Sequence, residues 1–202
     1  MRTAYIGMGG NLASWAGTPE ATLAAAALRL ESLGRVACRS SLYSTEPVGF
    51  AEQPRFVNAV VALETELEPR ELLKGLFELE REFGRDRAAG FANGPRTLDL
   101  DILLFGELRI DGPGLEIPHP RLAERAFVLV PLCEIAPRIV DAKSGSTVAQ
   151  LLNSLDPRAE TEPNAVFPIQ VDGWRAGADG GGAFPPEMRR ASPADDDDRG
   201  GG

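Results

Sequence analysis

One segment, from Leu98 to Phe105, constrains the fold of this chain more than any other, because it is the clearest β-strand in the sequence. Apolar residues fill most of its positions, and aspartates interrupt them at Asp99 and Asp101. Successive side chains of a strand point to opposite faces, so both aspartates share one face and the apolar residues beside them share the other. The fold must therefore give this strand one apolar face and one face with two carboxylates.

The rest of the first half alternates between strand and helix patterns. Apolar or alternating residues indicate strands around Tyr5–Ile6, over 36–45 and over 56–65. Helical spacing, with proline at the start and glycine at the end, indicates helices over 18–34 and 68–84. With the strand at 98–105, the order is β-α-β-β-α-β. This order predicts a ferredoxin-like α+β sandwich in a single domain, with extra C-terminal helices over 122–135.

The end of the chain differs in composition from the rest. Residues 159–202 hold nine acidic and four basic side chains and thirteen glycines or prolines, with no apolar periodicity. Such a segment lacks the apolar residues that a core requires. We therefore expect a folded domain over residues 1–158 and a tail over 159–202 that is disordered beyond about Pro168. A solvated extension is favoured over an interaction tail.

Charge and cysteine content argue against several classes of protein. A formal net charge of -9 argues against a nonspecific nucleic-acid binder, which needs a basic surface. No stretch approaches the roughly 18 apolar residues that span a bilayer, and no signal-peptide pattern opens the chain. Cys38 and Cys133 lie far apart and outside any Cys/His cluster, so neither a zinc site nor a disulfide is indicated. We expect a cytoplasmic monomer without nucleic-acid or membrane partners.

The two aspartates of the constraining strand have the spacing of a metal site. Asp99 and Asp101 would stand about 7 Å apart on one strand face. This separation suits carboxylates that hold one or two magnesium ions, since paired ions lie about 3.5 to 4 Å apart. The alternative is a solvated strand face, because D-x-D occurs in many unrelated strands.

Three arginines lie just before the aspartates. Arg85, Arg87 and Arg96 are within or beside a loop rich in alanine, glycine and asparagine. Arginines near a metal-binding carboxylate pair favour phosphoryl transfer, because guanidinium groups clamp phosphate oxygens and stabilise charge in the transition state. Surface ion pairs with the glutamates of the preceding helix are the alternative.

A histidine between prolines and a glycine cluster are two further features that resemble parts of phosphate-binding sites. His119 is the only histidine and lies between prolines, where it could donate to a phosphate together with Arg121 or Arg125. A lone loop histidine is, however, more often structural. The glycine cluster at 7–10 fits neither known nucleotide motif, because Leu12 replaces the third glycine of G-x-G-x-x-G and no P-loop occurs. Its glycines are expected to let the backbone turn near the bound molecule.

The stretch from Asn93 to Gly106, NGPRTLDLDILLFG, forms a long and specific motif. It closely resembles the 6-hydroxymethyl-7,8-dihydropterin pyrophosphokinases of folate biosynthesis. The resemblance covers roughly residues 3–155. It continues in AYIG at 4–7, GGNL at 9–12, STEPVG at 44–49, FVNA at 56–59, GR at 84–85 and PHPR at 118–121.

The resemblance implies that the chain transfers the terminal diphosphate of ATP to the hydroxymethyl group of a reduced pterin and releases AMP. It implies two magnesium ions on Asp99 and Asp101, and a transferring group held by Arg85 and Arg96. The implied ATP site consists of Leu73, Glu80, Arg87, Ile102, His119 and Arg125. The implied pterin site consists of main-chain contacts at Thr45, Pro47 and Val48, an edge contact from Asn58, and stacking on Phe56 and Phe127.

Residues 84–95 are then a candidate lid over both substrates. Two other functions compete with this one. A nucleotidyltransferase would use the same metal and arginines but release pyrophosphate, and the pterin-site residues argue against it. A noncatalytic ferredoxin-like module would leave D-x-D as a solvated face and predicts no magnesium-dependent ATP binding.

Overall fold

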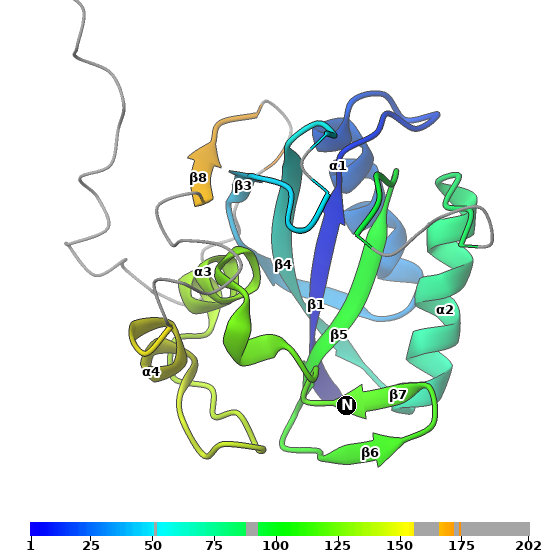
Figure 1. The fold of residues 1–202 in the computed structure, drawn as a ribbon. Coiled ribbons are helices and arrows are strands. Elements are labelled where there is room, and N and C mark those ends of the chain that lie inside the picture. The colour runs from blue at the N-terminus through cyan, green and yellow to red at the C-terminus, as the bar shows by residue number, and fades with distance from the viewer. Residues whose placement is uncertain (51, 88–92, 156–165, 172–173, 175–202) are drawn as a thin grey trace, which may run out of the picture.

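The computed structural model describes residues 1–50, 52–87, 93–155, 166–171 and 174. Their centre is an antiparallel sheet of six strands, in the order β5-β1-β4-β3-β8 with β2 also paired to β4 (Figure 1). The sheet strands are β1 (Arg2–Gly10), β2 (Arg35–Arg39), β3 (Leu42–Thr45), β4 (Phe56–Thr65), β5 (Asp99–Phe105) and β8 (Val166–Ile169). A separate hairpin joins β6 (Ile110–Gly112) to β7 (Leu115–Ile117).

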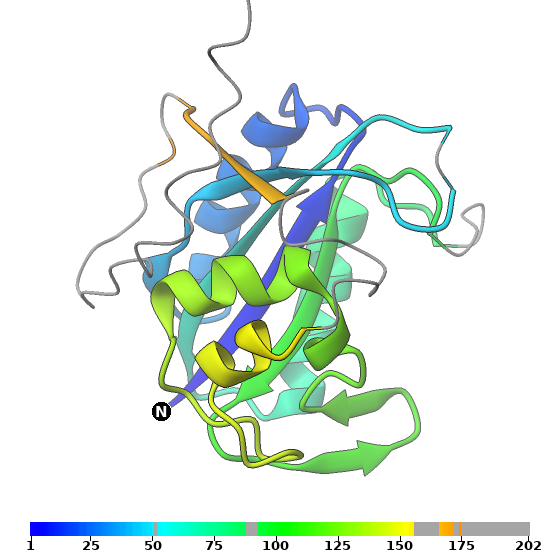
Figure 2. The same ribbon diagram turned by 60° about the vertical axis from the view of Figure 1, so that its left-hand side comes forward.

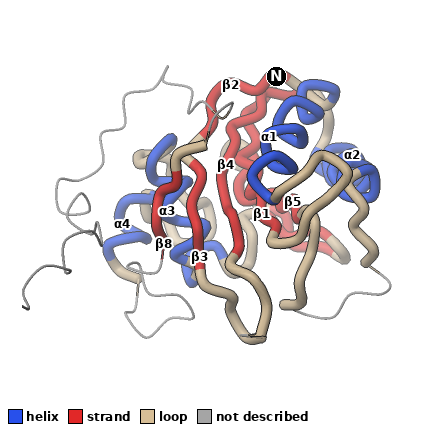
Figure 3. The backbone as a smooth tube through the Cα atoms, turned by 90° about the horizontal axis from the view of Figure 1, so that it is seen from above, coloured by secondary structure: helices blue, strands red, loops and turns tan. Residues whose placement is uncertain are grey.

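Helices lie on both faces of the sheet (Figures 2 and 3). One face carries α1 (Pro19–Arg29) and α2 (Pro69–Glu82), and the other carries α3 (Ala126–Ile135) and α4 (Val148–Asn153). Short 3-10 turns span Leu30–Ser32 and Leu122–Glu124. Treating β2 and β3 as one interrupted strand, the β-α-β-β-α-β order and the antiparallel pairing confirm the predicted ferredoxin-like sandwich with C-terminal helices.

The helix ends form where the sequence patterns predict them. Thr18 caps α1 by accepting a hydrogen bond from the backbone of Ala21, and a proline occupies the first helical position. At α2, Glu68 and Glu71 form a reciprocal capping box. Gly84 then ends α2 in the left-handed region, with φ of 83°, which favours glycine. The chain is thus turned at Arg85 toward the start of β5.

Apolar residues fill both faces of the sheet. Between the sheet and α1 and α2 lies one core, which includes the fully buried Ile6, Leu76 and Phe83. A second core lies under α3 and α4, around Leu104 and Leu129. The second core covers most of the α3 face of the sheet. The part of this face that stays open lies at the C-terminal end of β1 and the N-terminal ends of β4 and β5. In the part of the chain that the structure describes, no helix combines the length and apolarity needed to cross a bilayer.

The structure corrects the expected start of the tail. Val166–Ile169, inside the segment predicted as a tail, forms β8 and pairs antiparallel with β3. Trp174 is also buried against the core. Sequence reasoning missed this strand because four residues of mixed polarity give no periodicity, and the acidic, glycine-rich surroundings dominate the composition. The other residues of the predicted tail, 159–165, 172–173 and 175–202, lie outside the described residues.

A glutamate ties α3 to β3 across the second core. Glu134, near the end of α3, accepts hydrogen bonds from the backbone nitrogen of Ser41 at 2.7 Å, from its hydroxyl at 2.8 Å, and from the hydroxyl of Tyr43 at 2.9 Å. Tyr43 is 1% exposed, and burial followed by the Glu134 charge raises the pKa of its hydroxyl. The carboxylate thus fixes the start of β3 to the helix.

Glu134→Ala is expected to lower the free energy of unfolding by about 2 to 4 kcal/mol, because it leaves a backbone N–H and a buried phenol without an acceptor. Urea unfolding followed by circular dichroism measures this change. Glu78→Ala, on the exposed side of α2, is the control and should change stability by less than about 0.5 kcal/mol. Equal stabilities for the two variants would contradict the role assigned to Glu134.

Candidate functional site

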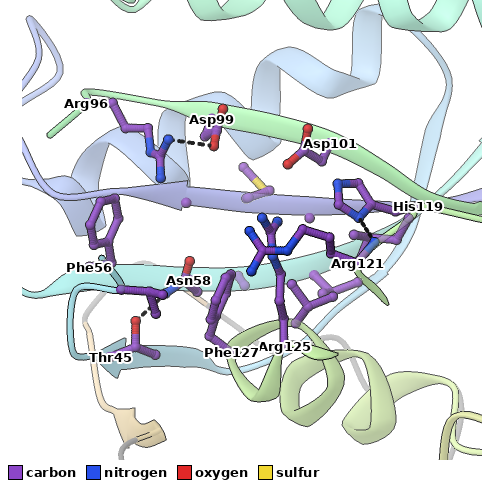
Figure 4. A pocket seen from close by; sticks show the side chains of 18 of the residues that line it. Thr45, Phe56, Asn58, Arg96, Asp99, Asp101, His119, Arg121, Arg125 and Phe127 are labelled. Atoms are coloured by element: carbon purple, nitrogen blue, oxygen red, sulfur yellow. Dashed lines mark hydrogen bonds and ion pairs between the residues drawn. The ribbon is translucent and has the colours of Figure 1, made fainter. Parts of the chain in front are cut away.

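A cavity of about 280 Å³ opens on the α3 face of the sheet, at the C-terminal end of β1 and the N-terminal ends of β4 and β5 (Figure 4). Strands β3, β4 and β5, the start of α3 and the segment after β7 all contribute side chains to it. Most of the predicted site residues line this one cavity: Thr45, Val48, Phe56, Asn58, Arg85, Arg96, Asp99, Asp101, His119, Arg125 and Phe127. The fold therefore brings residues that are distant in the sequence together around one cavity.

Glycines of β1 form the floor of the cavity. Gly7 pairs with Asp101, and Gly9 lies between Asp99 on one side and Asn58 on the other. A Cβ atom at Gly9 would stand 2.8 Å from the side-chain oxygen Oδ1 of Asn58, closer than Cβ atoms normally approach, so any other residue would displace the Asn58 amide. The glycines keep a flat surface between the carboxylates and the amide. Sequence reasoning placed them near the bound molecule, and the strand pairing gives them this specific role.

Asp99 is held by two arginines. Arg85 Nη2 lies 3.2 Å from one carboxylate oxygen of Asp99, and Arg96 Nη1 lies 3.4 Å from the other. Arg85 also donates to the backbone oxygen of Leu98 at 3.1 Å, which anchors it at the entry of β5. The guanidinium of Arg96 lies 5.0 Å from the ring centre of Phe56. Both arginines are thus directed at the end of the cavity that holds the carboxylates.

Asp101 has a different environment. Burial, followed by the negative charge of Asp99, raises the pKa of Asp101 to about 6, against the opposing charges of Arg125, Arg87 and Arg96. A raised carboxyl pKa means that the ionised form is under-stabilised in the protein alone. A divalent cation between the two carboxylates would remove that penalty.

The donor set fits magnesium bound together with phosphates. Within the described ranges, no three His, Cys, Asp or Glu side chains cluster as a metal site, and the carboxylates that lie together on one strand face of the cavity are those of Asp99 and Asp101. Magnesium commonly takes one or two carboxylates and completes its shell with substrate phosphates and water. The Nε atoms of Arg96 and Arg125 are buried without a hydrogen-bond partner among the described residues. Phosphate oxygens would satisfy them.

His119 is neutral at physiological pH. Burial, followed by the positive charges of Arg125 and Arg121, lowers the pKa of His119 to about 4. Its Nδ1 accepts a hydrogen bond from the backbone nitrogen of Arg121 at 3.1 Å, so the single ring proton lies on Nε2. Its own backbone nitrogen donates to Leu103 on β5 at 2.9 Å. His119 can therefore donate one hydrogen bond but cannot add positive charge.

The opposite end of the cavity suits a flat polar ring. Asn58 is 8% exposed and donates from Nδ2 to Thr45 Oγ1 at 2.7 Å, which fixes its amide and leaves a second N–H and the carbonyl oxygen for a ligand. Phe56 and Phe127 lie on either side of it, from β4 and the first turn of α3 (Figure 4). The Arg125 guanidinium lies 5.5 Å from the ring centre of Phe127.

Five predicted residues do not line this cavity. Two of them, Glu80 and Arg87, form an ion pair at 2.6 Å beside a shallower hollow along α2, and the Glu80 carboxylate also accepts from the backbone of Leu100 at 2.8 Å. Ile102 is 4% exposed and faces the α2 core because it follows Asp101 on the strand. The five residues are Pro47, Leu73, Glu80, Arg87 and Ile102. Their substrate contacts stay predictions.

The structure adds lining residues that the predicted set lacks. Arg121, two residues after His119, lines the cavity; the sequence named it as an alternative to Arg125 for a phosphate contact, and the resemblance did not select it. Asn93, just before the Gly-Pro-Arg motif, and Glu46, beside Thr45, also face the cavity. All three lie within the motifs PHPR, NGPRTLDLDILLFG and STEPVG, so a set of all motif residues would have included them. The predicted lid over 84–95 falls partly on residues 88–92, which lie outside the described residues.

Comparison with known proteins decides the family. The sequence model of the 7,8-dihydro-6-hydroxymethylpterin-pyrophosphokinase (HPPK) family matches residues 5–137 of this chain. The chain belongs to the HPPK family. All of the cavity residues lie within the matched range.

Several HPPK relatives are known under the name 2-amino-4-hydroxy-6-hydroxymethyldihydropteridine pyrophosphokinase. The protein of Pseudomonas aeruginosa is 48% identical over 135 residues, which cover 66% of this chain and 80% of the relative. That of Synechocystis is 38% identical over 185 residues, which cover 92% of this chain and 87% of the relative. A mitochondrial folate synthesis bifunctional protein of Arabidopsis thaliana is 49% identical over 117 residues, or 57% of this chain and 21% of that protein.

Solved structures agree with the HPPK fold. Wild-type HPPK-DHPS of Plasmodium falciparum with SDX-DHP superposes with a TM-score of 0.56 at 16% identity, over 76% of this chain and 43% of that one. An HPPK-DHPS in complex with substrates gives a TM-score of 0.59 at 15% identity, over 76% and 43%. This chain thus spans less than half the length of these HPPK-DHPS chains, and the likeness concerns the fold.

Proposed function

We propose that this chain transfers the terminal diphosphate of ATP to the hydroxymethyl group of 6-hydroxymethyl-7,8-dihydropterin and releases AMP, a step of folate biosynthesis. Membership of the HPPK family supports this reaction. The observation that carries the proposal is the single cavity in which an aspartate pair with arginines faces an asparagine between two phenylalanines. One end suits phosphates and the other a planar heterocycle.

Asp99 and Asp101 would hold magnesium, with two ions as the full complement when ATP is bound. Bound magnesium would neutralise charge on the phosphate oxygens and orient them. The carboxylates share one strand face and one cavity, and Asp101 carries a raised pKa that a cation would reverse. The arginines beside Asp99 keep its carboxylate directed along the cavity.

The positively charged side chains would bind the transferring group. Arg85 and Arg96 lie on the aspartate side, and Arg125 reaches the cavity from the start of α3, so the group would be held from two directions. Neutral His119 would donate from Nε2 to a phosphate oxygen. These arginines are partly buried, and such guanidinium groups stabilise the charge of the transition state more strongly than fully exposed ones, because water screens them less.

The pterin would lie between Phe56 and Phe127, with its polar edge at Asn58. Stacking on both faces holds the plane, and the fixed amide rejects rings that cannot pair with it. Main-chain groups of Thr45, Pro47 and Val48 would complete the edge contacts. The hydroxymethyl group would then point along the floor of β1 toward the aspartates.

The transfer would be an in-line displacement. The hydroxymethyl oxygen forms a bond to the β-phosphorus and loses its proton to solvent. The bond from that phosphorus to the oxygen that bridges it to the α-phosphorus breaks, and AMP leaves with that oxygen. His119 has a pKa of about 4 and Asp101 would be occupied by its cation, so neither is suited to act as general base. Positioning and electrostatic stabilisation would supply most of the rate.

We also propose that the enzyme acts in the cytoplasm as a monomer. Its two cysteines, Cys38 and Cys133, are both free thiols, as is usual in a reducing compartment. Size-exclusion chromatography with light scattering tests the oligomeric state, and a dimer at micromolar concentration would contradict it.

Phosphorus NMR of the reaction mixture tests the chemistry. Protein, ATP, magnesium and the pterin should yield AMP and a new pair of coupled diphosphate resonances on the pterin. A nucleotidyltransferase would release free pyrophosphate instead, and an ordinary kinase would yield ADP. Either of those products in place of AMP would overturn the proposed reaction.

Phe127→Ala is expected to raise the KM for the pterin about 10- to 100-fold, because it removes one stacking face worth about 1.5 to 3 kcal/mol. The KM for ATP should change by less than about threefold. Initial rates at varied pterin and fixed saturating ATP give the KM for the pterin.

Phe77→Ala, on the outer side of α2 away from this cavity, is the matched control and should leave the KM for the pterin unchanged. Equal pterin KM values in both variants would contradict the assignment.

A further inference from the structure

Strand β3 carries one wall of the cavity but is short. It pairs with β4 only through Tyr43, Ser44 and Thr45. On its other edge β8 pairs with the whole of β3, from Leu42 opposite Ile169 to Thr45 opposite Val166 (Figures 1 and 2). Without β8, the backbone groups on that edge would be exposed, and a four-residue strand held from one side is prone to fray.

A buried tryptophan anchors the end of this segment. Trp174 is 9% exposed, and its indole nitrogen donates to the backbone oxygen of Ser40 at 2.8 Å. The Arg39 guanidinium lies 5.6 Å from its ring centre. Ser40 is fully buried and also accepts, through its hydroxyl, from the backbone of Val60 on β4 at 2.9 Å. The tryptophan therefore fixes the corner between β2 and β3.

A second contact connects β8 with the residues around Thr45. The ring centre of Phe167 lies 5.6 Å from the guanidinium carbon of Arg55. Arg55 donates to the hydroxyl of Ser44 at 2.8 Å and forms an ion pair with Glu46. These two partners flank Thr45, whose hydroxyl accepts the hydrogen bond that orients Asn58.

The strand β8, with Phe167, and Trp174 lie beyond the part matched by the family model, which ends at residue 137. We propose that the described C-terminal residues, 166–171 with Trp174, act as a positioning strap that fixes β3 and thereby Thr45 and Asn58 for pterin binding. This proposal rests on the proposed function, because it assigns the pterin to the wall that the strap supports. The aspartates of the phosphate end lie on β5, at the opposite edge of the sheet from β8.

The strap predicts a selective kinetic defect. Trp174→Ala in the full chain should raise the KM for the pterin by about 5- to 20-fold, and the KM for ATP by less than about twofold, at a temperature where the variant is folded. Trp174→Phe keeps most of the packing and should recover most of the affinity. Phe167→Ala, at a partly exposed position, should show a smaller rise and keeps the test available if Trp174→Ala does not fold. Leu28→Ala, on the exposed side of α1, is the control and should match wild type.

Amide hydrogen exchange of the ligand-free proteins separates failure of the strap from failure of the proposed function. Trp174→Ala should accelerate exchange over 42–46, with β5 unchanged. Exchange over 42–46 that stays as slow as in wild type contradicts the strap, whatever the activity. A variant with unchanged pterin KM but lower stability would also overturn the proposal, since the segment would then only stabilise the fold. The remaining outcome is that exchange at 42–46 is faster in the variant, but the wild-type protein does not turn over the pterin. The strap would then still hold β3, and the proposed reaction would be refuted instead.

Discussion

Asp101→Asn is expected to lower kcat by at least about a thousandfold and, at the same time, to stabilise the metal-free protein. Activity is lost because an amide is a poor ligand for magnesium. Stability is gained because the ionised Asp101 is buried beside Asp99, which raises its pKa from 3.8 to about 6. One unit of pKa shift corresponds to about 1.4 kcal/mol, so the gain should be about 1 to 3 kcal/mol at pH 8.

The pH dependence of this gain follows from the direction of the shift. Between about pH 4 and 6 the folded protein binds a proton at Asp101 that the unfolded chain has lost, so the free energy of unfolding falls as pH rises through this window. The amide that replaces this carboxyl in the variant does not titrate. The difference between the variant and wild type should therefore be small at about pH 4 and reach its full value above about pH 6, as measured by urea unfolding in EDTA.

Asp99→Asn is the matched control for this prediction. It should also be inactive, but it should lose stability, because Arg85 and Arg96 would lose the carboxylate that both contact. An Asp101→Asn enzyme with near-normal turnover would refute the metal assignment. An inactive variant without any gain in stability would refute the electrostatic account of Asp101.

Arg96→Ala is expected to lower kcat by about 100- to 1000-fold, because it removes a partly buried guanidinium that would stabilise charge on the transferring group. Arg96→Lys should recover only part of the loss, since an ammonium lacks the planar, two-pronged geometry. Steady-state rates of AMP formation at saturating substrates measure both effects.

Arg2→Ala is the control for Arg96→Ala. Arg2 also lies over an aromatic ring, that of Phe105, but it is not among the cavity residues. It should retain kcat within about twofold. A similar kcat in Arg2→Ala and Arg96→Ala would contradict the role of Arg96 in the reaction.

The sequence patterns predict the core of the fold because, within each element, the local signals all indicate the same secondary structure. Capping residues, a terminal glycine and helical spacing define α2, and the placement of two aspartates in an apolar run defines β5. β8 could not be found in this way. Its four residues are stable as a strand only because β3 offers an unpaired edge, and Trp174 is buried only because Ser40 offers an acceptor. These conditions are tertiary, and no local pattern records them.

The candidate site, too, is predictable from the sequence only where local geometry decides it. Asp99 and Asp101 share a face by strand geometry alone, so their meeting in one cavity is predictable from spacing. Asn58 and Phe127 lie in strand and helix patterns that are equally consistent with core positions, and only the resemblance to a family selects them. The contrast between Asp99, paired with two arginines, and Asp101, with a raised pKa, depends on the antiparallel register of β1 and β5 and on α3. Sequence spacing cannot give that contrast.

The most direct test of the central claim is AMP release by the purified protein supplied with ATP, magnesium and 6-hydroxymethyl-7,8-dihydropterin. Parallel reactions omit the pterin, replace magnesium by EDTA, or use Asp101→Asn. The geometry of the cavity predicts rapid AMP formation only in the complete wild-type reaction, with one pterin diphosphate formed per AMP. AMP formation that is independent of the pterin, or no AMP from folded protein with all three components, would contradict it.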